Sequence, residues 1–177
     1  MSVLDAVKSW GSTAEERSQK LACDERVPDP KLILLRAVDV DAPRPLVYRW
    51  LCQLRYAPYS YDLIDNRGRR SPQELTPGAE RLELGQRMVA IFKLAHFEPD
   101  EQLTLISRSR LLGHVALTYL VRDRGADASR LVLRIAWGPP GLPGARQALA
   151  LGDLMMSRRQ LLNFKRLAER DAHRVGA

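Results

Sequence analysis

Two tyrosines and two carboxylates lie close together in the segment Tyr59-Ser60-Tyr61-Asp62-Leu63-Ile64-Asp65. A carboxylate can act as a general base and a phenol can donate a hydrogen bond to a carbonyl oxygen, as an aldol-type cyclisation requires. If this segment is a strand, Tyr59 and Tyr61 share one face and Asp62 lies on the other. We therefore expect the two tyrosines to line a binding site. Asp62 is a weak catalytic candidate, and a structural role in a salt bridge is favoured.

His114 is the other weak catalytic candidate. It begins an apolar run in which it shares a strand face with Ala116 and Thr118, whereas Tyr119 lies on the opposite face. The two rings therefore cannot face one site. A single histidine at the start of a strand is more often exposed or hydrogen-bonded than catalytic.

Arg36 lies on a strand face that is otherwise apolar, beside Leu34 and Val38. A charge in such a position is costly unless it is paired. Its partner is either an internal carboxylate or the acidic group of a ligand, and the sequence leaves both open.

The motifs of the common enzyme classes are absent. The chain has no Ser/His/Asp order, phosphate loop, dinucleotide fingerprint or metal triad. Cys23 and Cys52 have neither CxxC nor Cys/His spacing, so we expect two reduced thiols, with Cys52 in a helix and Cys23 in a loop. We expect no metal and no cofactor, and a binding protein rather than an enzyme.

The elements that position these residues follow from periodicity. The first expected strand is apolar on both faces, so we expect other elements to cover it on both sides. The prolines near position 43 predict the start of a helix. The aromatic segment at 56–66 is strand-like, and a long connection follows over 67–85. Short polar connections then join four strands into an antiparallel meander, before a long helix. The expected strands are Lys31–Val40, Gln86–Phe97, Gln102–Ser109, His114–Arg122 and Arg130–Trp137, and the final helix is Arg146–Arg170.

The first 30 residues are an irregular lead-in to one domain that covers residues 1–177. Ser12 and Thr13 are each followed three positions later by a glutamate, Glu15 and Glu16, which is the spacing of a capping box for a short helix. The segment from Asp24 to Pro30 is irregular. With 45% hydrophobic and 28% charged residues, the composition is that of a globular domain.

The formal net charge of +7 raises the question of anionic partners. The arginines are spread along the chain and few aromatics interleave with them, so a nucleic-acid partner is not expected. A protein or anionic-surface interaction through the loop at Arg67–Arg70 stays an alternative.

No apolar stretch is long enough to cross a bilayer and no signal-peptide pattern begins the chain, so we expect a cytoplasmic location.

The order of elements and three local strings resemble the SRPBCC superfamily, the START-related and polyketide-cyclase-like proteins. The strings are Arg36-Ala37-Val38-Asp39-Val40-Asp41-Ala42-Pro43, Tyr59-Ser60-Tyr61-Asp62 followed by Ile64-Asp65-Asn66, and Gly152-Asp153 followed by Met155-Met156 and Arg159-Gln160-Leu161-Leu162. The resemblance implies an α+β helix-grip fold, in which a curved antiparallel sheet wraps around the long C-terminal helix. It also implies a hydrophobic cavity between sheet and helix.

We therefore expect an apolar small molecule, such as a lipid or polyketide, to bind in this cavity. The alternative is a polyketide cyclase-, aromatase- or dehydratase-like enzyme. The geometry of a bent sheet is an independent argument for the cavity, because side chains cannot completely fill its concave side around one helix. A methionine suits the cavity wall because thioethers adapt to irregular shapes. The expected lining residues are Arg36, Trp50, Tyr59, Tyr61, Phe92, Tyr119, Trp137 and Met155.

Overall fold

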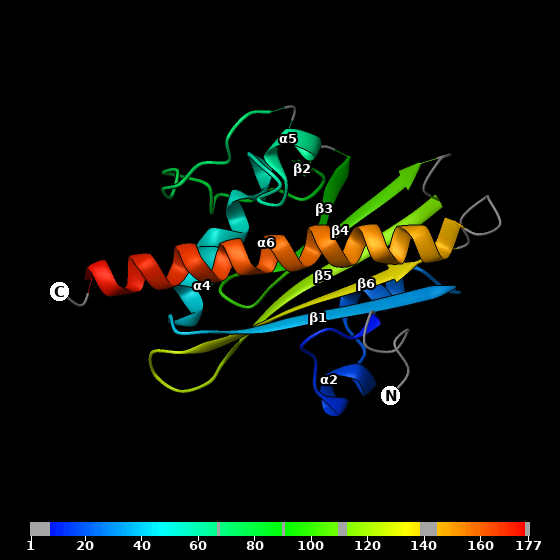
Figure 1. The fold of residues 1–177 in the computed structure, drawn as a ribbon, viewed down its shortest axis with the longest axis horizontal. Coiled ribbons are helices and arrows are strands. Elements are labelled where there is room, and N and C mark those ends of the chain that lie inside the picture. The colour runs from blue at the N-terminus through cyan, green and yellow to red at the C-terminus, as the bar shows by residue number, and fades with distance from the viewer. Residues whose placement is uncertain (1–7, 67, 90, 110–112, 139–144, 176–177) are drawn as a thin grey trace.

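A computed structural model describes residues 8–66, 68–89, 91–109, 113–138 and 145–175. In these residues one antiparallel sheet has six strands in the order β1-β6-β5-β4-β3-β2, and the long helix α6 (Ala145–Val175) lies across one face of it (Figure 1). The predicted α+β fold, with a curved antiparallel sheet and a long C-terminal helix, is confirmed. The strands are β1 (Leu32–Val40), β2 (Arg87–Met88), β3 (Phe92–Glu98), β4 (Gln102–Ser109), β5 (Gly113–Asp123) and β6 (Ser129–Trp137).

Both faces of the central strands are buried. On β1, Leu34 and Val38 belong to the main core with residues of α6, and they define the inner face of the sheet. Leu35 and Ala37 alternate with them and pack on the outer face. The first strand is therefore covered on both sides, as its sequence predicts.

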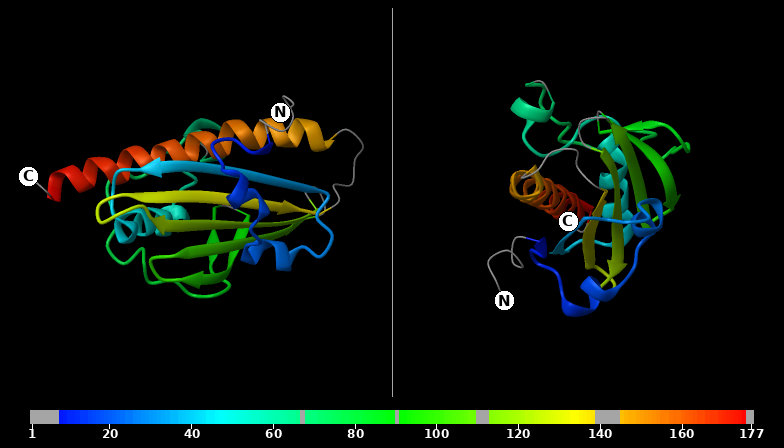
Figure 2. Two further views of the ribbon diagram at one scale, coloured as in Figure 1. Left: turned by 90° about the horizontal axis from the view of Figure 1, so that it is seen from below. Right: turned by 90° about the vertical axis from the view of Figure 1, so that its right-hand side faces the viewer.

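The N-terminal segment begins beside α6, where the Arg158 guanidinium lies over the Trp10 ring at 5.1 Å, and its two short helices then cover the outer face of the sheet (Figure 2). Thr13 caps α2 (Ala14–Ser18) in the predicted capping box with Glu16. A second short helix, α3 (Ala22–Arg26), corrects the prediction that Cys23 lies in a loop. The Asp24 carboxylate accepts the Leu21 N–H at 2.8 Å and so stabilises the first turn of this helix.

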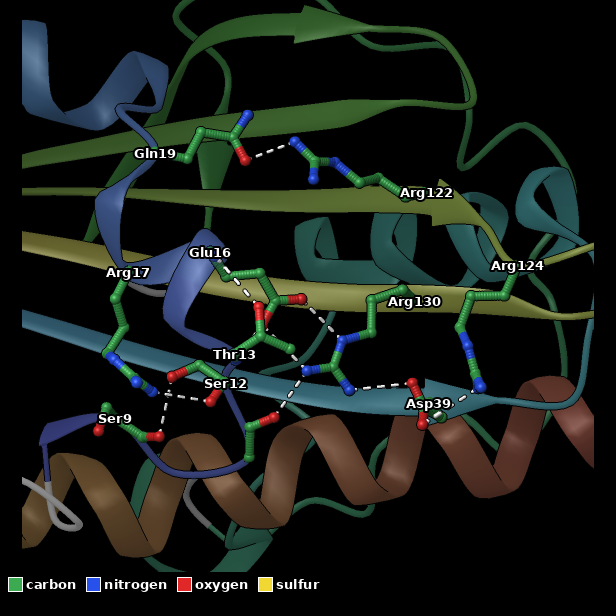
Figure 3. A network of polar contacts seen from close by, with 11 residues as sticks. Ser9, Ser12, Thr13, Glu16, Arg17, Gln19, Asp39, Arg122, Arg124 and Arg130 are labelled. Carbon is green, nitrogen blue, oxygen red and sulfur yellow. Dashed lines mark hydrogen bonds and ion pairs between the residues drawn. The ribbon is translucent and has the colours of Figure 1, made fainter. Parts of the chain in front are cut away.

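A network of polar contacts fixes this segment to the sheet (Figure 3). Arg130 on β6 donates to Glu16 at 2.8 Å, to Asp39 at 2.9 Å and to the Gly11 carbonyl oxygen at 2.6 Å. Gly11 has a φ of +71°, and an added Cβ would lie 2.1 Å from the Ala37 carbonyl oxygen. Only glycine fits this close approach of the N-terminal segment to β1.

The helix predicted after Pro43 is α4 (Arg44–Cys52), which continues into the short 3-10 helix η1 (Gln53–Arg55). Its apolar face is fully buried at Trp50, Leu51 and Leu54, and Cys52 lies in the helix as predicted.

The strand predicted over 86–97 is two strands. Beta-strands β2 and β3 form a hairpin in which Met88 pairs with Phe92. Val89 has a φ of +37°, and its N–H donates to the Leu54 carbonyl oxygen at 2.9 Å. A left-handed residue cannot continue a strand, so the chain reverses here.

The prediction of a strand-like segment at 56–66 is wrong. The segment contains one turn of helix, α5 (Asp62–Asp65), and pairs with no strand in the described residues. Pro58 has no N–H to donate to a ladder, and Tyr59 has a φ of +57°. The Asp62 carboxylate accepts the N–H and hydroxyl of Ser71, which holds the turn against the loop that follows.

The helices of the described residues are either too short or too polar to span a membrane.

Candidate small-molecule pocket

A pocket of about 380 Å³ lies between α6 and the segments on either side of α5. Figure 1 shows α5 and its flanking segments on one side of α6. Five lining residues precede or begin α5, three follow it, and four lie on α6. They are Tyr59, Ser60, Tyr61, Asp62, Leu63, Arg70, Ser71, Gln73, Arg159, Asn163, Arg166 and Leu167.

One stripe of α6 forms a wall of the pocket. Arg159, Asn163, Arg166 and Leu167 are spaced at i, i+4, i+7 and i+8, which places them on one side of a helix. At 1.5 Å per residue the stripe from Arg159 to Arg166 is about 10 Å long. The wall therefore carries two guanidinium groups with one amide between them.

Hydrogen bonds from α6 hold the opposite wall in place. The Asn163 side-chain amide donates to the Tyr59 carbonyl oxygen at 2.7 Å, and the Gln160 amide donates to the Pro58 carbonyl oxygen. Tyr119 on β5 donates its hydroxyl to Gln160 Oε1 at 2.5 Å. Tyr119 thus supports the pocket through Gln160 and is a positioning residue rather than a lining residue.

The pocket has a positive side. The Arg159 guanidinium lies over the Tyr61 ring, 5.7 Å from its centre, and Arg166 Nη2 donates to Gln73 Oε1 at 3.0 Å. Neither contact neutralises charge, since one partner is an aromatic ring and the other an amide. Within the described part of the chain, these two arginines and Arg70 form no ion pair with a carboxylate.

Tyr59 forms the inner end of the pocket and is only 1% exposed. Its ring packs against Trp50 at 6.1 Å and Phe164 at 5.2 Å between ring centres. Its hydroxyl finds no hydrogen-bond partner among the described residues. Burial, together with the nearby Asp62 carboxylate, raises the pKa of the Tyr59 phenol, which therefore stays protonated at neutral pH.

The structure brings three predicted site residues, Tyr59, Tyr61 and Asp62, into this pocket. Their expected strand geometry is wrong, because Asp62 lies in the same wall as the tyrosines. The Asp62 carboxylate is also engaged by two hydrogen bonds from Ser71, which favours the structural role.

The other predicted aromatic residues lie elsewhere. Trp50 is fully buried in the core, where its Nε1 donates to Asp171 at 3.2 Å. Trp137 and Phe92 face the inner side of the sheet from β6 and β3, outside the pocket wall. Met155 is 62% exposed on α6, so the expectation that it lines an enclosed cavity is wrong.

Arg36 is fully buried on the inner face of β1, as its sequence position predicts. Its Nη1 donates to the carbonyl oxygens of Lys8 at 2.7 Å and Leu35 at 2.9 Å. These two backbone acceptors help to compensate the buried guanidinium. A contact of Arg36 with a ligand stays a prediction.

His114 lies on the outer face of β5, where it pairs with Arg108 of β4. Tyr119 lies on the inner face, so the predicted separation of the two rings is confirmed. Burial and the neighbouring Arg108 charge lower the pKa of the imidazole. The imidazole on the outer face is separated by the sheet from α6 and the pocket.

The pocket lies beside α6 rather than beneath it, which differs from the predicted cavity between helix and sheet. Large side chains occupy the space under the C-terminal half of the helix. Trp50 and Tyr59 from one side meet Leu161, Phe164 and Leu167 from α6 in one buried cluster. Close packing of these groups moves the open space outward to the 59–73 segment.

Sequence reasoning missed the α6 side of the pocket. The helical spacing of Arg159, Asn163 and Arg166 could have predicted this wall, because it places the three polar side chains on one side of the helix that the apolar residues predict. Arg70 and Gln73 carried no such signal, since only the fold brings their loop to α6. Among the described residues no three His, Cys, Asp or Glu side chains are grouped so as to hold a metal ion.

No protein-family model matches the chain, and no curated protein matches it either. Solved structures do match. The di-domain ARO/CYC protein BexL of the BE-7585A biosynthetic pathway aligns with a TM-score of 0.51 at 14% identity, over 77% of this chain and 46% of that one. The chain has the helix-grip fold.

Two further solved structures align over nearly their whole length. A protein from Mesorhizobium loti aligns with a TM-score of 0.50 at 14% identity, over 78% of this chain and 97% of that one. A protein from Nitrosospira multiformis aligns with a TM-score of 0.51 at 12% identity, over 80% and 99%. The chain spans about half the length of the di-domain neighbour, and at these identities the likeness concerns the fold.

Proposed function

We propose that this helix-grip protein binds a small organic molecule in the pocket between α6 and the 59–73 segment. The observation that carries the proposal is an open pocket of about 380 Å³ whose lining side chains come from three parts of the chain. Small-molecule sites occupy about 300–1,000 Å³ and combine apolar walls with a few placed polar groups. Here Tyr61 and Leu63 supply apolar surface, and Ser60 and Asn163 supply polar groups.

This wall composition favours an amphipathic ligand over the wholly apolar one that the sequence suggested. Four of the twelve lining residues carry a formal charge, and these are Asp62, Arg70, Arg159 and Arg166. A purely hydrocarbon ligand would desolvate them without compensation. A molecule with an apolar body and a polar end satisfies both kinds of wall.

A polyketide cyclase-like activity is the second candidate. Tyr61 and Asp62 share the pocket, and the helix-grip fold is also that of an ARO/CYC protein. The activity requires Asp62 to leave Ser71 and act as a base. Asp62→Asn abolishes turnover of a polyketide-like substrate on this hypothesis, whereas simple binding survives the exchange. Cytoplasmic location stays a prediction.

The test is to identify what the purified protein carries. Native mass spectrometry, followed by denaturation and analysis of released small molecules, is expected to find a bound organic molecule. In Gln73→Trp the larger ring fills the pocket, so the bound fraction falls. Leu84→Trp is the matched control, because Leu84 is 67% exposed and lies outside the pocket wall.

Equal occupancy in both variants would place the ligand elsewhere and contradict the proposal. Protein that carries nothing, and that binds nothing from a metabolite extract, would contradict it too.

A further inference from the structure

We infer that the pocket is selective for anionic small molecules, those that carry a carboxylate, phosphate or sulfonate group. The inference rests on the proposed function and adds the charge of the ligand. Its basis is the arrangement of three guanidinium groups around one cavity, two of them on α6 and one on the facing loop: Arg159, Arg166 and Arg70.

The contacts of these guanidinium groups position them without neutralising them. The Tyr61 ring holds Arg159 through its π face, and the Gln73 amide oxygen accepts from Arg166. Each guanidinium has five N–H donors, and these contacts use few of them. The remaining N–H groups can donate to a planar or tetrahedral anion, which arginine binds with two parallel hydrogen bonds.

The acidic groups nearby do not cancel this charge. Among the described residues that line the pocket, Asp62 is the only carboxylate, and it accepts two hydrogen bonds from Ser71. Other arginines of the chain show the contrast. Arg130 and Arg134 each pair with a carboxylate at 2.8 Å on the outer face of the sheet.

The rest of the wall suits the body of such a ligand. Tyr61 and Leu63 border the cavity and give it an apolar side. A flat or acyl body can lie against these groups while its anionic end reaches the arginines. Recognition of both parts separates this class of ligand from inorganic anions, which have no apolar body.

The experiment uses two fluorescent probes that differ by one charge. Anilinonaphthalene sulfonate and phenylnaphthylamine share an aromatic skeleton, and only the first carries a sulfonate. Fluorescence titrations of the 177-residue protein are expected to give at least tenfold tighter binding of the sulfonate probe, since charge-assisted hydrogen bonds contribute that much. Inorganic phosphate competes weakly because it lacks the aromatic body.

Arginine variants test whether the preference for the sulfonate probe arises at the pocket. Arg159→Gln and Arg166→Gln are each expected to weaken binding of the sulfonate probe about tenfold while leaving the neutral probe unchanged. The matched controls remove the same charge outside the pocket wall. They are Arg158→Gln, next to Arg159, and Arg69→Gln, and both leave the affinity for either probe within about twofold.

The results separate the two claims. Equal affinity for the two probes, with both blocked by Gln73→Trp, overturns the anion selectivity and leaves the pocket in place. A loss of sulfonate binding in Arg69→Gln as large as in Arg159→Gln also overturns the selectivity, because the charge would then act at long range. Binding of neither probe, or binding that Gln73→Trp does not change, overturns the proposed function and the selectivity together.

Discussion

Removal of the Tyr59 hydroxyl is expected to stabilise the protein. The side chain is 1% exposed, and its oxygen has no hydrogen-bond partner among the described residues. Folding therefore takes this hydroxyl out of water without compensation, which costs about 1–3 kcal/mol. Tyr59→Phe removes that cost and keeps the ring contacts with Trp50 and Phe164.

The expected gain in unfolding free energy is about 1 kcal/mol, the lower end of that range, because the removed oxygen leaves a small void that opposes part of the gain. In a chain of 177 residues this corresponds to a rise in Tm of about 2–4 °C. Differential scanning calorimetry and urea unfolding on the ligand-free protein measure it.

Tyr119→Phe is the matched control. Tyr119 is 3% exposed, but its hydroxyl donates to the buried Gln160 at 2.5 Å. Its removal deprives Gln160 of this donor and is expected to cost about 1–2 kcal/mol. If Tyr59→Phe instead lowers the Tm as much as Tyr119→Phe does, the Tyr59 hydroxyl has a partner in solution and the reasoning is refuted.

Three further perturbations test the outer face and the thiols. Gly11→Ala places a Cβ 2.1 Å from a β1 carbonyl oxygen, so limited proteolysis is expected to cleave the N-terminal segment faster than in Ser12→Ala. Burial opposes ionisation of Glu16, but hydrogen bonds from Arg130 and the Thr13 backbone outweigh it and lower the Glu16 pKa from 4.5. The stabilising contribution of the Glu16 carboxylate is therefore complete above about pH 4.5 and is lost as the pH falls through the lowered pKa. Urea unfolding is expected to show that the unfolding free energy of Glu16→Gln falls less over that pH interval than that of the unchanged protein. Burial raises the pKa of Cys23 to about 11 and of Cys52 to about 12, so Ellman's reagent at pH 8 is expected to react only after denaturation, and rapid reaction of the native protein would contradict the placement of both thiols.

The fold could be predicted because its main signals are local. Alternation along β1 and the meander, the prolines before α4 and the long apolar period of α6 each specify an element without reference to its neighbours. The capping box at Thr13 is equally local, and the structure confirms it. These elements then have few ways to bury their apolar faces, and the sheet under one long helix follows.

The pocket could be predicted only in part because it depends on a segment whose conformation is not local. The aromatic residues at 56–66 favour a strand, but Tyr59 adopts a left-handed conformation and packs on Trp50 and Phe164 instead. Tertiary contacts therefore override the strand propensity of this segment. The same contacts fill the space beneath the C-terminal half of α6, and the pocket lies at the flank of that half.

The central claim is that a small molecule binds between α6 and the 59–73 segment. Heteronuclear NMR during titration with anilinonaphthalene sulfonate tests it most directly, because side-chain amide signals report position. The account predicts that the Asn163 and Gln73 side-chain signals shift most, at the two sides of the pocket. Shifts centred instead on the exposed side of α6 around Met155 and Leu162, with Asn163 unchanged, would contradict it.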